Sequence, residues 1–462
     1  MKHLFTSFII TIFLLTTLSK VFSEPVSLAD VQKAAMNFLY GKADASLKDK
    51  LSLMLHKEVT DAVTKKTSLY IFDIKPQGFI ILTADDDLVP VVGYSFDDNY
   101  SETANPVQNW FMELQLSLAL KNKIEDKQNQ AAWKALLTSK SEKPVKEVAP
   151  LCTTRWDQGQ YYNYMCPVDS NGPGGHAYAG CVATAMGQVM KRWNNPITGV
   201  GGYAYQHIWP MYYNNYGVVE ANFGATTYNW NNMPNQINNS NKIDVATLLF
   251  HCGVSVKMSY GPDGSGTHTE KVPFALKQYF RYHESAEFIE RNFNPGARWD
   301  SLMKEQLDKG FPMVYSGSTL SEGHAWVVDG YQDSSYFHVN WGWSGWNNGY
   351  YYFSNLNSGN GDFTNLQGAV INIFPHDYVY AAPSKPSTDG ISVYPNPALN
   401  YFNINGVDKN FRVDVINTNG LTLRSLENKR RVSLADLESG LYFVKITQSN
   451  MQKIIKLLVI GE

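Results

Sequence analysis

Residue types that cooperate in covalent acyl-transfer chemistry occur far apart in this 462-residue chain. Cys181 follows the glycine-rich stretch 174–180, His324 follows a glycine, and Asn340 comes after a further apolar segment. A cysteine thiolate can attack a carbonyl carbon, a histidine can move the proton, and an amide oxygen can fix the tautomer of the histidine. These residue types predict peptide-bond chemistry through a covalent thioester.

A helix is expected to begin at Cys181. The apolar residues that follow recur at helical spacing on one face; they are Val182, Ala185, Met186, Val189, Met190 and Trp193. The N-terminus of a helix has unpaired amides and favours an anion, so this position is expected to lower the pKa of the thiol. The spacing alone fits a buried structural cysteine equally well.

A β-hairpin is expected to carry the histidine. Residues 323–331 predict one strand and residues 336–341 the return strand, with a turn between them. A hairpin that closes near Gln332 sets Asn340 opposite His324, within about one residue pair. The Asn340 amide oxygen would then accept from one ring nitrogen and leave the other free for the thiol.

Two more histidines and a glutamine complete the candidate set. His176 lies near Cys181 in sequence and competes for the role of base, whereas His338 is expected to be a strand histidine with a satisfied ring. Gln158, within residues 156–160, offers an amide that could join the Cys181 backbone N–H in an oxyanion hole. No pair of Cys or His falls at metal-ligand spacing, so neither a metal nor another cofactor is predicted.

The N-terminus predicts export. Lys2 gives a basic start, residues 4–18 are apolar, and small residues precede Glu24, so residues 1–23 are expected to be a signal peptide. The alternative, a membrane anchor, requires a longer apolar run, and no other segment is long enough to cross a bilayer. A net charge of -3 without a Lys/Arg stripe predicts no nucleic-acid partner.

Only four cysteines are present, which excludes a small disulfide-rich scaffold. Export permits one bridge, and Cys152 with Cys166 is the pair closest in sequence, but connectivity cannot be deduced from spacing. Cys252 lies in an apolar stretch and is expected to be a buried, inert thiol.

Three units with two linkers are expected, and the overall class is α+β. Residues 24–145 predict a first helix capped by Ser27 or Asp30, paired strands at 69–73 and 78–83, a helix at 107–124 and a polar linker from Ser139. The helix has Val31, Ala34, Ala35, Phe38 and Leu39 on one face. Residues 146–376 form the second unit, residues 377–389 a linker, and residues 390–462 a small antiparallel β-sandwich.

Together these segments resemble the streptopain family of papain-like cysteine proteases. The matching motifs occur in family order and are Trp156-Asp-Gln-Gly, Gly180-Cys-Val-Ala-Thr-Ala, Tyr260-Gly-Pro-Asp-Gly-Ser-Gly, Gly323-His-Ala and His338-Val-Asn-Trp-Gly-Trp-Ser-Gly. The resemblance implies a two-lobed protease domain, with a helical lobe and an antiparallel β lobe.

The resemblance also implies roles for the site residues. Cys181 is the expected nucleophile and His324 its base. Gln158 with the Cys181 amide is the expected oxyanion hole, and Asn340 with Trp341 is expected to orient and shield the histidine.

The flanking units resemble accessory parts of such proteases. Residues 78–95 look like the family's inhibitory propeptide, which makes the polar segment from Ser139 to Pro150 the expected processing zone. The C-terminal sandwich resembles the sorting domain of type IX secretion cargo, on the motifs Val393-Tyr-Pro-Asn-Pro and Gly440-Leu-Tyr-Phe-Val-Lys.

The sequence therefore predicts a secreted cysteine endopeptidase of the virulence type, made as a zymogen. Its expected partners are protein or peptide substrates, its own propeptide and outer-membrane secretion machinery, with export through the periplasm to the medium or the cell surface. The alternative is an inactive surface adhesin or binding protein on a protease scaffold. A third interpretation, a secreted inhibitor, leaves the second unit unexplained.

Overall fold

The protein is described from a computed structural model. The described residues are 25–60, 65–102, 127–139, 147–207, 215–294, 297–318, 323–333, 335–352, 367–378, 391–407, 409–418, 420–448 and 451–460. The predicted signal peptide, the predicted helix at 107–124, residues 140–146 of the first linker and residues 379–389 of the second lie outside them. The chain forms two compact units, Met1–Tyr378 and Val379–Glu462. Below, the N-terminal segment is residues 25–139, the central segment residues 147–378 and the C-terminal unit residues 391–460.

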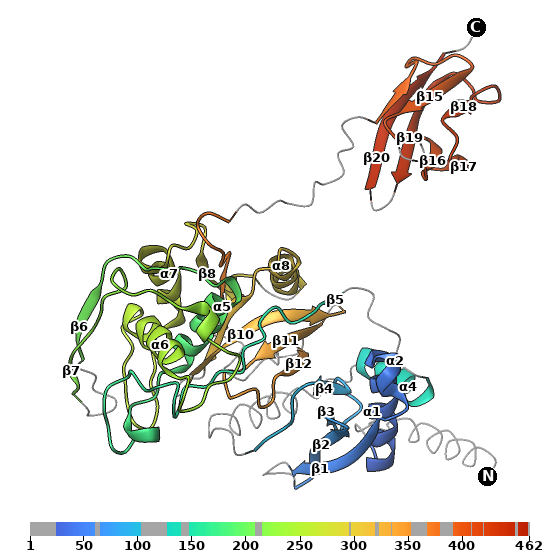
Figure 1. Ribbon diagram of the computed structural model, residues 1–462. Coiled ribbons are helices and arrows are strands. Elements are labelled where there is room, and N and C mark those ends of the chain that lie inside the picture. Colours follow the sequence, from blue (N-terminus) through green and yellow to red (C-terminus); the bar gives the residue numbers. More distant parts are fainter. Residues whose placement is uncertain are drawn as a thin grey trace, which may run out of the picture. The chain divides into compact units, whose positions relative to one another are not determined.

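The first unit contains both helices and strands (Figure 1). Its helices are α1 (Leu28–Lys42), α2 (Ala45–Lys48), α4 (Lys127–Thr138), α5 (Cys181–Trp193), α6 (Ile243–Ser255), α7 (Val272–Phe280) and α8 (Ala297–Asp308), with short 3-10 helices at Pro173–Gly175, Trp230–Asn232, Thr269–Lys271 and Arg291–Phe293. Its strands are β1 (Ser52–Thr60), β2 (Thr67–Lys75), β3 (Phe79–Thr83), β4 (Val91–Ser95), β5 (Glu147–Val148), β6 (Tyr203–His207), β7 (Gly217–Ala221), β8 (Glu287–Glu290), β9 (Met313–Ser318), β10 (Gly323–Gln332), β11 (Tyr336–Asn340), β12 (Gly349–Tyr352) and β13 (Gly368–Ile371).

One antiparallel sheet crosses the boundary between the N-terminal and central segments. Within the described residues it has eleven strands in the order β1-β2-β3-β4-β12-β11-β10-β9-β13-β8, with β5 added to β10. The junction is the pairing of β4 with β12, in which Tyr350 faces Tyr94 and Tyr351 faces Gly93. Strands β6 and β7 form a separate hairpin.

The N-terminal segment folds as its sequence predicts. Helix α1 begins after Ser27, whose hydroxyl accepts from the Asp30 amide at 3.1 Å, as expected of an N-cap. All five predicted apolar residues of this helix are buried. The predicted strand pair is also confirmed, because β2 pairs with β3.

Alternate residues of β2 and β3 belong to two different hydrophobic cores. One face packs against α1 and Trp133 of α4, with Phe72 and Ile80 in that core. The opposite face, which includes Ile71, shares a core with Trp326 and other residues of the central segment. The N-terminal segment therefore contributes side chains to the same core that lies behind the predicted histidine.

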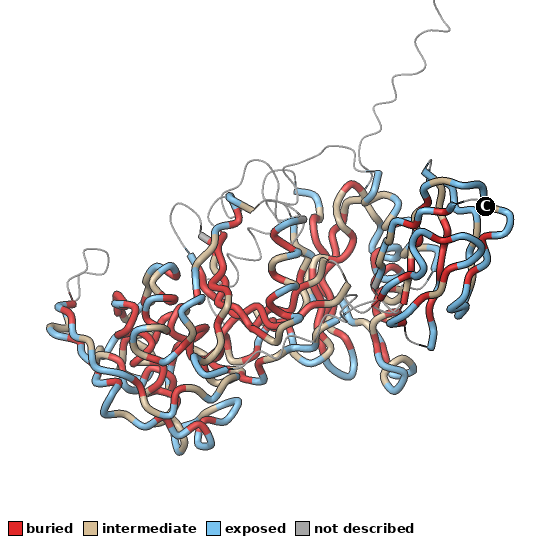
Figure 2. The backbone as a smooth tube through the Cα atoms, turned by 90° about the horizontal axis from the view of Figure 1, so that it is seen from above, coloured by how far each residue is buried: buried red, intermediate tan, exposed pale blue. Residues whose placement is uncertain are grey.

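The other face of the central strands packs against helices α5 and α6. Ala325 and Val327 of β10 lie in a core with the predicted apolar face of α5. Figure 2 shows this buried interior as continuous red tube through the helices and strands. This packing brings the start of α5 to the start of β10.

The start of the central segment is tied to β10. Val148 of β5 pairs with Tyr331, and the Leu151 amide donates to the Asp329 carbonyl at 2.9 Å. The Cys152 amide donates to the buried Asp329 carboxylate at 2.8 Å. Residues 147–152 are therefore part of the sheet, whereas the sequence placed residues up to 150 in an exposed processing zone.

The C-terminal unit consists of strands alone within its described residues. They are β14 (Ser392–Tyr394), β15 (Tyr401–Asn405), β16 (Arg412–Asn417), β17 (Thr422–Glu427), β18 (Arg431–Ser433), β19 (Gly440–Gln448) and β20 (Met451–Val459). They form a three-stranded and a four-stranded sheet around one core, which includes Phe402 and Val444. The predicted β-sandwich is confirmed.

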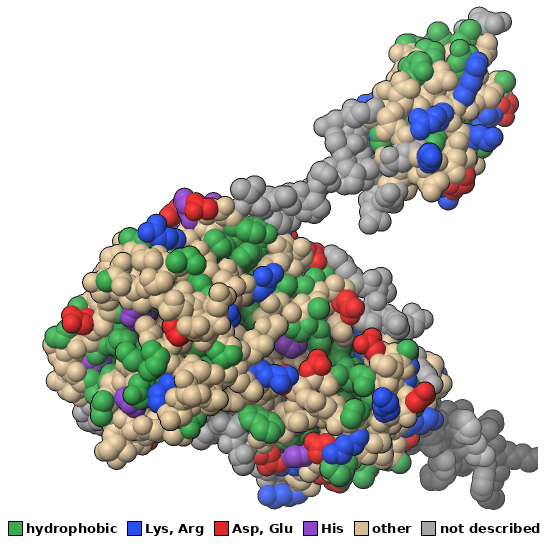
Figure 3. All heavy atoms as spheres, in the orientation of Figure 1, with side chains coloured by type: hydrophobic (Ala, Val, Ile, Leu, Met, Phe, Trp, Pro, Cys, Tyr) green, Lys and Arg blue, Asp and Glu red, His purple; other side chains and the backbone are tan. Residues whose placement is uncertain are grey.

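Charged side chains of both signs lie on the face of the first unit that Figure 3 shows. Figure 3 shows Lys and Arg side chains scattered among acidic ones on the visible face of the first unit, without a basic stripe. No helix in the described part of the chain has the length and apolar character needed to cross a membrane.

Candidate active site

Cys181 is the first residue of α5, as the sequence predicts. The preceding Gly180 has φ 90°, a conformation that favours glycine, and a Cβ there would lie 2.7 Å from the end of the Met258 side chain. The glycine therefore allows a tight entry into the helix. It presents the Cys181 thiol at the helix N-terminus in a half-buried position.

The electrostatics of this thiol differ from the prediction. Burial raises the pKa of Cys181, while the backbone amides of Ala325, Val182 and Cys181 itself act in the opposite direction. Desolvation of the anion therefore outweighs the helix N-terminus in the described state. The contact with the Ala325 amide also places the sulfur one residue along the chain from His324.

The His324 ring is buried among tryptophans. It stacks on Trp343 at a centroid distance of 4.9 Å and also contacts Trp326 and Trp341. Its Nε2–H donates to the Trp341 carbonyl at 3.0 Å, so Nδ1 carries the lone pair. Burial lowers the pKa of His324 to about 4, and the bond to Trp341 opposes this shift.

The Cys181 side chain and the His324 ring pack against different cores in this state. Ala325 belongs to the core that contains α5, whereas the ring lies with Trp326 and Trp341 in the other core. Within the described residues no hydrogen bond joins the Cys181 thiol to His324. The structure thus brings the two predicted residues to adjacent backbone positions but leaves their side chains unpaired.

The hairpin is present, but its predicted register is wrong by about three residues. Asn340 pairs with Val327 rather than with His324, because the ladder starts at Gln332 with Tyr336. A bulge between Val328 and Gly330 moves the partner of Asn340 by only one residue, toward His324. The Asn340 amide nitrogen donates to the Thr154 carbonyl at 2.6 Å. In the described state the group that holds the His324 ring is the Trp341 carbonyl.

Trp341 is itself held by two asparagines. Its indole N–H donates to the Asn347 carbonyl at 3.0 Å, and its backbone amide donates to the Asn348 side chain at 2.9 Å. These bonds fix the carbonyl that holds the His324 ring. The sequence showed Trp341 but not these two supports, which follow it in the loop before β12.

Gln158 lies against the segment that precedes the nucleophile. Its backbone carbonyl accepts from the Ala179 amide at 2.9 Å, and its backbone amide donates to the Asp157 carboxylate at 2.7 Å. Gln158 is mostly buried, and within the described residues its side-chain amide has no hydrogen bond. An unoccupied amide at this position suits an oxyanion donor.

Gln188 is a supporting residue that sequence reasoning missed. It lies two turns after Cys181 on α5 and is fully buried. Its side-chain oxygen accepts from the Thr154 hydroxyl at 3.0 Å and from the Trp156 amide at 3.4 Å. It therefore ties the segment that carries Gln158 to the helix that carries Cys181. A polar residue on an otherwise apolar helix face was the available signal.

The N-terminal segment contacts the same loop. The Asn347 amide donates to the Asn99 carbonyl at 3.0 Å, and the Asn347 side chain exchanges two hydrogen bonds with the Ser101 backbone at 2.8 and 3.3 Å. A continuous path of contacts thus runs from the N-terminal segment through Asn347 and Trp341 to His324.

The other candidate residues have structural partners. The His176 Nδ1 lies at hydrogen-bond distance from the Cys166 carbonyl oxygen, 2.9 Å, and the His338 Nδ1 lies 2.6 Å from the Asp329 carboxylate. All four cysteines are free thiols, and Cys152, Cys166 and Cys252 are buried. Cys181 is therefore the most accessible thiol.

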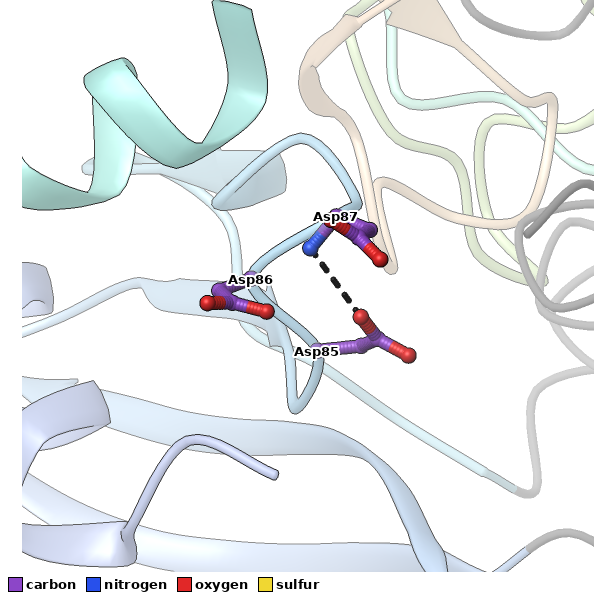
Figure 4. A group of neighbouring side chains, drawn as sticks. All are labelled: Asp85, Asp86 and Asp87. Atoms are coloured by element: carbon purple, nitrogen blue, oxygen red, sulfur yellow. Dashed lines mark hydrogen bonds between the residues drawn. The ribbon is translucent and has the colours of Figure 1, made fainter. Parts of the chain in front are cut away.

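Three consecutive aspartates, Asp85, Asp86 and Asp87, form an acidic turn after β3 (Figure 4). The Asp87 amide donates to the Asp85 carboxylate at 3.0 Å, and the Gln130 side chain donates to Asp87 at 2.7 Å. Trp133 donates to the Asp85 carbonyl at 3.1 Å. These bonds attach α4 to the turn, which is a structural role.

Comparison with protein families matches three consecutive parts of the chain. Residues 23–118 match the Spi protease inhibitor family, residues 156–351 the peptidase C10 family, and residues 392–460 the secretion system C-terminal sorting domain. The matched peptidase segment contains Cys181, His324 and Gln158.

Known proteins give the same result. Streptopain from Streptococcus pyogenes is 30% identical over 335 residues, which cover 67% of this chain and 81% of streptopain. The thiol protease/hemagglutinin PrtT from Porphyromonas gingivalis is 28% identical over 420 residues, 85% of this chain, and the chain spans only 45% of that relative's length. A solved fragment of prointerpain A from Prevotella intermedia is 30% identical with a TM-score of 0.56, over 70% of this chain and 99% of the fragment.

These matches agree with the papain-like fold class predicted from the sequence and with the order of the three units. The chain belongs to the peptidase C10, or streptopain, family of thiol proteases, with a Spi-type inhibitor segment before the peptidase and a secretion sorting domain after it.

Proposed function

We propose that the chain is a secreted cysteine endopeptidase made as a zymogen, in which Cys181 is the nucleophile and His324 the base. The observation that carries this proposal is the contact of the Cys181 sulfur with the amide of Ala325, the neighbour of His324. In the active state the ring turns toward the sulfur. Nδ1 takes the thiol proton while Nε2 keeps its own.

The reaction is acyl transfer in two steps. The thiolate attacks the peptide carbonyl, and the oxyanion is held by the Cys181 amide and the Gln158 side chain. His324 gives its proton to the leaving amine, and a thioester remains on Cys181. Water then loses a proton to His324 and attacks the thioester, which releases the acid and restores the thiol. In this scheme Asn340 and Trp341 orient and shield the His324 ring.

The N-terminal segment acts as the propeptide that keeps this site latent. With the thiol pKa raised and the His324 pKa lowered to about 4, both groups are neutral at pH 7, and proton transfer between them is unfavourable. Asn99 and Ser101 hold Asn347, which holds Trp341. Loss of the N-terminal segment frees this loop and lets the ring leave the tryptophan cluster.

The C-terminal unit directs export. We propose passage through the periplasm and recognition of residues 390–462 by the outer-membrane secretion machinery, followed by release or surface attachment. The proposed boundaries are 1–23 for the signal peptide, 24–145 for the propeptide and 146–376 for the protease, with a linker at 377–389. The proposed substrates are proteins or peptides.

Replacement of the nucleophile tests the chemistry. The variant Cys181→Ala is expected to lose both precursor processing and casein cleavage, whereas Cys252→Ala, which also removes one thiol, keeps them. A Cys181→Ala chain that still cleaves casein refutes the assignment. An inactive adhesin would give no selective modification of Cys181 by a thiol-directed active-site label, while the processed enzyme gives modification that His324→Ala abolishes.

A further inference from the structure

One peptide unit of the site, between Trp341 and Gly342, is hydrogen-bonded at both ends. Its carbonyl accepts from His324 Nε2–H at 3.0 Å, and its amide donates to the Asn340 side-chain oxygen at 3.2 Å. The carbonyl keeps the ring in the tryptophan cluster, and the amide occupies the oxygen through which Asn340 would orient that ring. A turn of this single peptide would end both restraints together.

Gln188 places an unused hydrogen-bond donor beside this peptide. The Oε1 atom of its fully buried side chain accepts from the Thr154 hydroxyl and the Trp156 amide, so the other end of the side chain is the Nε2 donor. Within the described residues this Nε2 has no hydrogen-bond partner. A Cβ added at Gly342 would lie 3.8 Å from it, so the donor is a neighbour of the Gly342 backbone. A buried donor without an acceptor destabilises the state that contains it.

The amide end of the peptide points toward a polar group that also contains Gln188. Hydrogen bonds connect this group from the Gly342 amide to Asn340, from Asn340 Nδ2 to the Thr154 carbonyl at 2.6 Å, and from the Thr154 hydroxyl to Gln188 at 3.0 Å. The carbonyl and the amide of a trans peptide point in opposite directions. A turn of the peptide therefore brings its carbonyl to the side of Gln188, where it also repels the Asn340 oxygen.

Gly342 permits such a turn. Its φ is 73°, in the left-handed region that favours glycine, and a glycine adopts positive and negative φ at similar cost. A side chain at this position would in addition press on Thr184, because a Cβ there would lie 3.1 Å from the Thr184 methyl carbon. The residue at the end of this peptide is therefore one that can change its backbone conformation in a buried environment.

We propose that Gln188 is a positioning residue of the active enzyme and that it holds the Trp341–Gly342 peptide in a turned orientation. When the N-terminal segment is lost, the carbonyl leaves His324 and accepts from Gln188 Nε2. The amide leaves Asn340, whose oxygen then accepts from His324 Nε2–H while Nδ1 faces the Cys181 sulfur. The hydrogen bonds that break are replaced, and the donor of Gln188 is no longer unused. This inference rests on the proposed protease function.

A comparison of the latent and processed forms tests this role without any measurement of activity. In the Cys181→Ala chain, Gln188→Met removes the amide and keeps the length of the side chain. The processed form of this chain is prepared with an added protease. Because only the processed form uses the donor, Gln188→Met is expected to lower its unfolding temperature by about 3 °C more than that of the precursor. Equal losses in the two forms would overturn the proposed turn.

Gln306→Met is the matched control. Gln306 is a buried glutamine of α8, and its Nε2 donates to the Asn372 side chain at 3.1 Å in the described state. Its donor is already used in the precursor, so Gln306→Met should lower the unfolding temperature of both forms equally. In the processed enzyme it should leave kcat within about twofold.

Gln188→Glu gives a kinetic signature that a purely structural role would not produce. A protonated carboxyl can donate to the turned carbonyl, whereas a carboxylate can only accept, and burial favours the protonated form at low pH. Relative to wild type, kcat of the processed Gln188→Glu enzyme is expected to stay within about twofold at pH 5 and to fall about tenfold at pH 9. KM should change by less than about twofold at both pH values, because the residue orients the histidine rather than the substrate.

The processed Gln188→Met enzyme, which has no donor at any pH, should lose about tenfold in kcat at both pH values. A ratio of Gln188→Glu to wild type that does not change with pH would overturn the assignment. A processed wild-type enzyme that cleaves no peptide contradicts the proposed protease function itself, and the unfolding temperatures then decide on Gln188 alone.

Discussion

The two ends of the chain are attached to the peptidase in opposite ways. The N-terminal segment extends the peptidase sheet through β4 and β12 and shares a hydrophobic core with Trp326 and Trp341. The C-terminal unit has its own two sheets and its own core. A segment that shares a core with the site can control its chemistry, whereas a separately folded unit can be removed without changing it.

The largest test of this difference is a pair of matched core truncations in the non-cleaving Cys181→Ala chain. Phe79 in the N-terminal segment and Phe402 in the C-terminal unit are both fully buried, and Phe79 belongs to the core that contains Trp326 and Trp341. Each change to Ala is expected to cost about 3–5 kcal/mol. Phe79→Ala should lower the unfolding temperature of the peptidase as well, and Phe402→Ala only that of its own unit, as followed by calorimetry. A peptidase transition unmoved by Phe79→Ala contradicts the shared core.

A smaller change at the β4–β12 junction tests how tightly the propeptide is held. A Cβ added at Gly93 would lie 2.6 Å from the Tyr351 ring, and Tyr351 is buried. Overpacking of this kind costs about 1–3 kcal/mol, so Gly93→Ala should speed dissociation of a nicked N-terminal segment by about 5- to 150-fold. Gly440→Ala in the C-terminal unit, with its nearest atom at 3.9 Å, is the control. Unchanged dissociation on size-exclusion chromatography counts against the junction.

Asp98 should make that dissociation depend on pH. Burial raises the pKa of Asp98 from 3.8 to about 6, while the Arg155 guanidinium 3.0 Å away opposes the shift. The docked state therefore favours the protonated carboxyl, so docking is strongest below pH 3.8 and weakens as the pH rises to about 6. The full shift corresponds to release about tenfold faster at pH 8 than at pH 5, and after allowance for partial solvent screening an increase of about threefold is expected. Asp98→Asn should flatten this profile, and a profile that stays steep assigns the dependence to another group.

The smallest expected effect is that of removing residues 379–462 from the processed enzyme. Because the C-terminal unit has its own core, kcat/KM for a peptide substrate should stay within about twofold. Secretion from the producing cell, measured as enzyme in the medium, should be lost. A large fall in kcat/KM would show that the peptidase site depends on the C-terminal unit as well as on the N-terminal segment.

Local sequence patterns correctly predicted the structural features that depend on residues close together in the chain. The spacing of Val182, Ala185 and Met186 was enough for helix α5, and the glycine before Cys181 marked its start. Alternation predicted the strands of the C-terminal unit, and Ser27 predicted the cap of α1. Each of these features depends on residues that are close together in the chain.

Features that depend on distant contacts could not be predicted in this way. The start of the ladder at Gln332 with Tyr336 determines the partner of Asn340, and strand alternation alone does not specify this register. The position at the helix N-terminus predicted a lowered pKa for the Cys181 thiol, but burial raises this pKa. The pairing of Gly93 with Tyr351 joins segments that show no relation in sequence.

The anchoring of residues 147–152 has a consequence for maturation. The Asp329 carboxylate is fully buried and is shared between the Cys152 amide and His338. An enzyme whose first residue precedes Glu147 keeps this arrangement and keeps β5 paired with β10, the strand that carries His324. A cut beyond Cys152 would leave a buried charge short of one donor. The position of the activating cut therefore helps to determine whether residues 147–152 still support β10, the strand that carries His324.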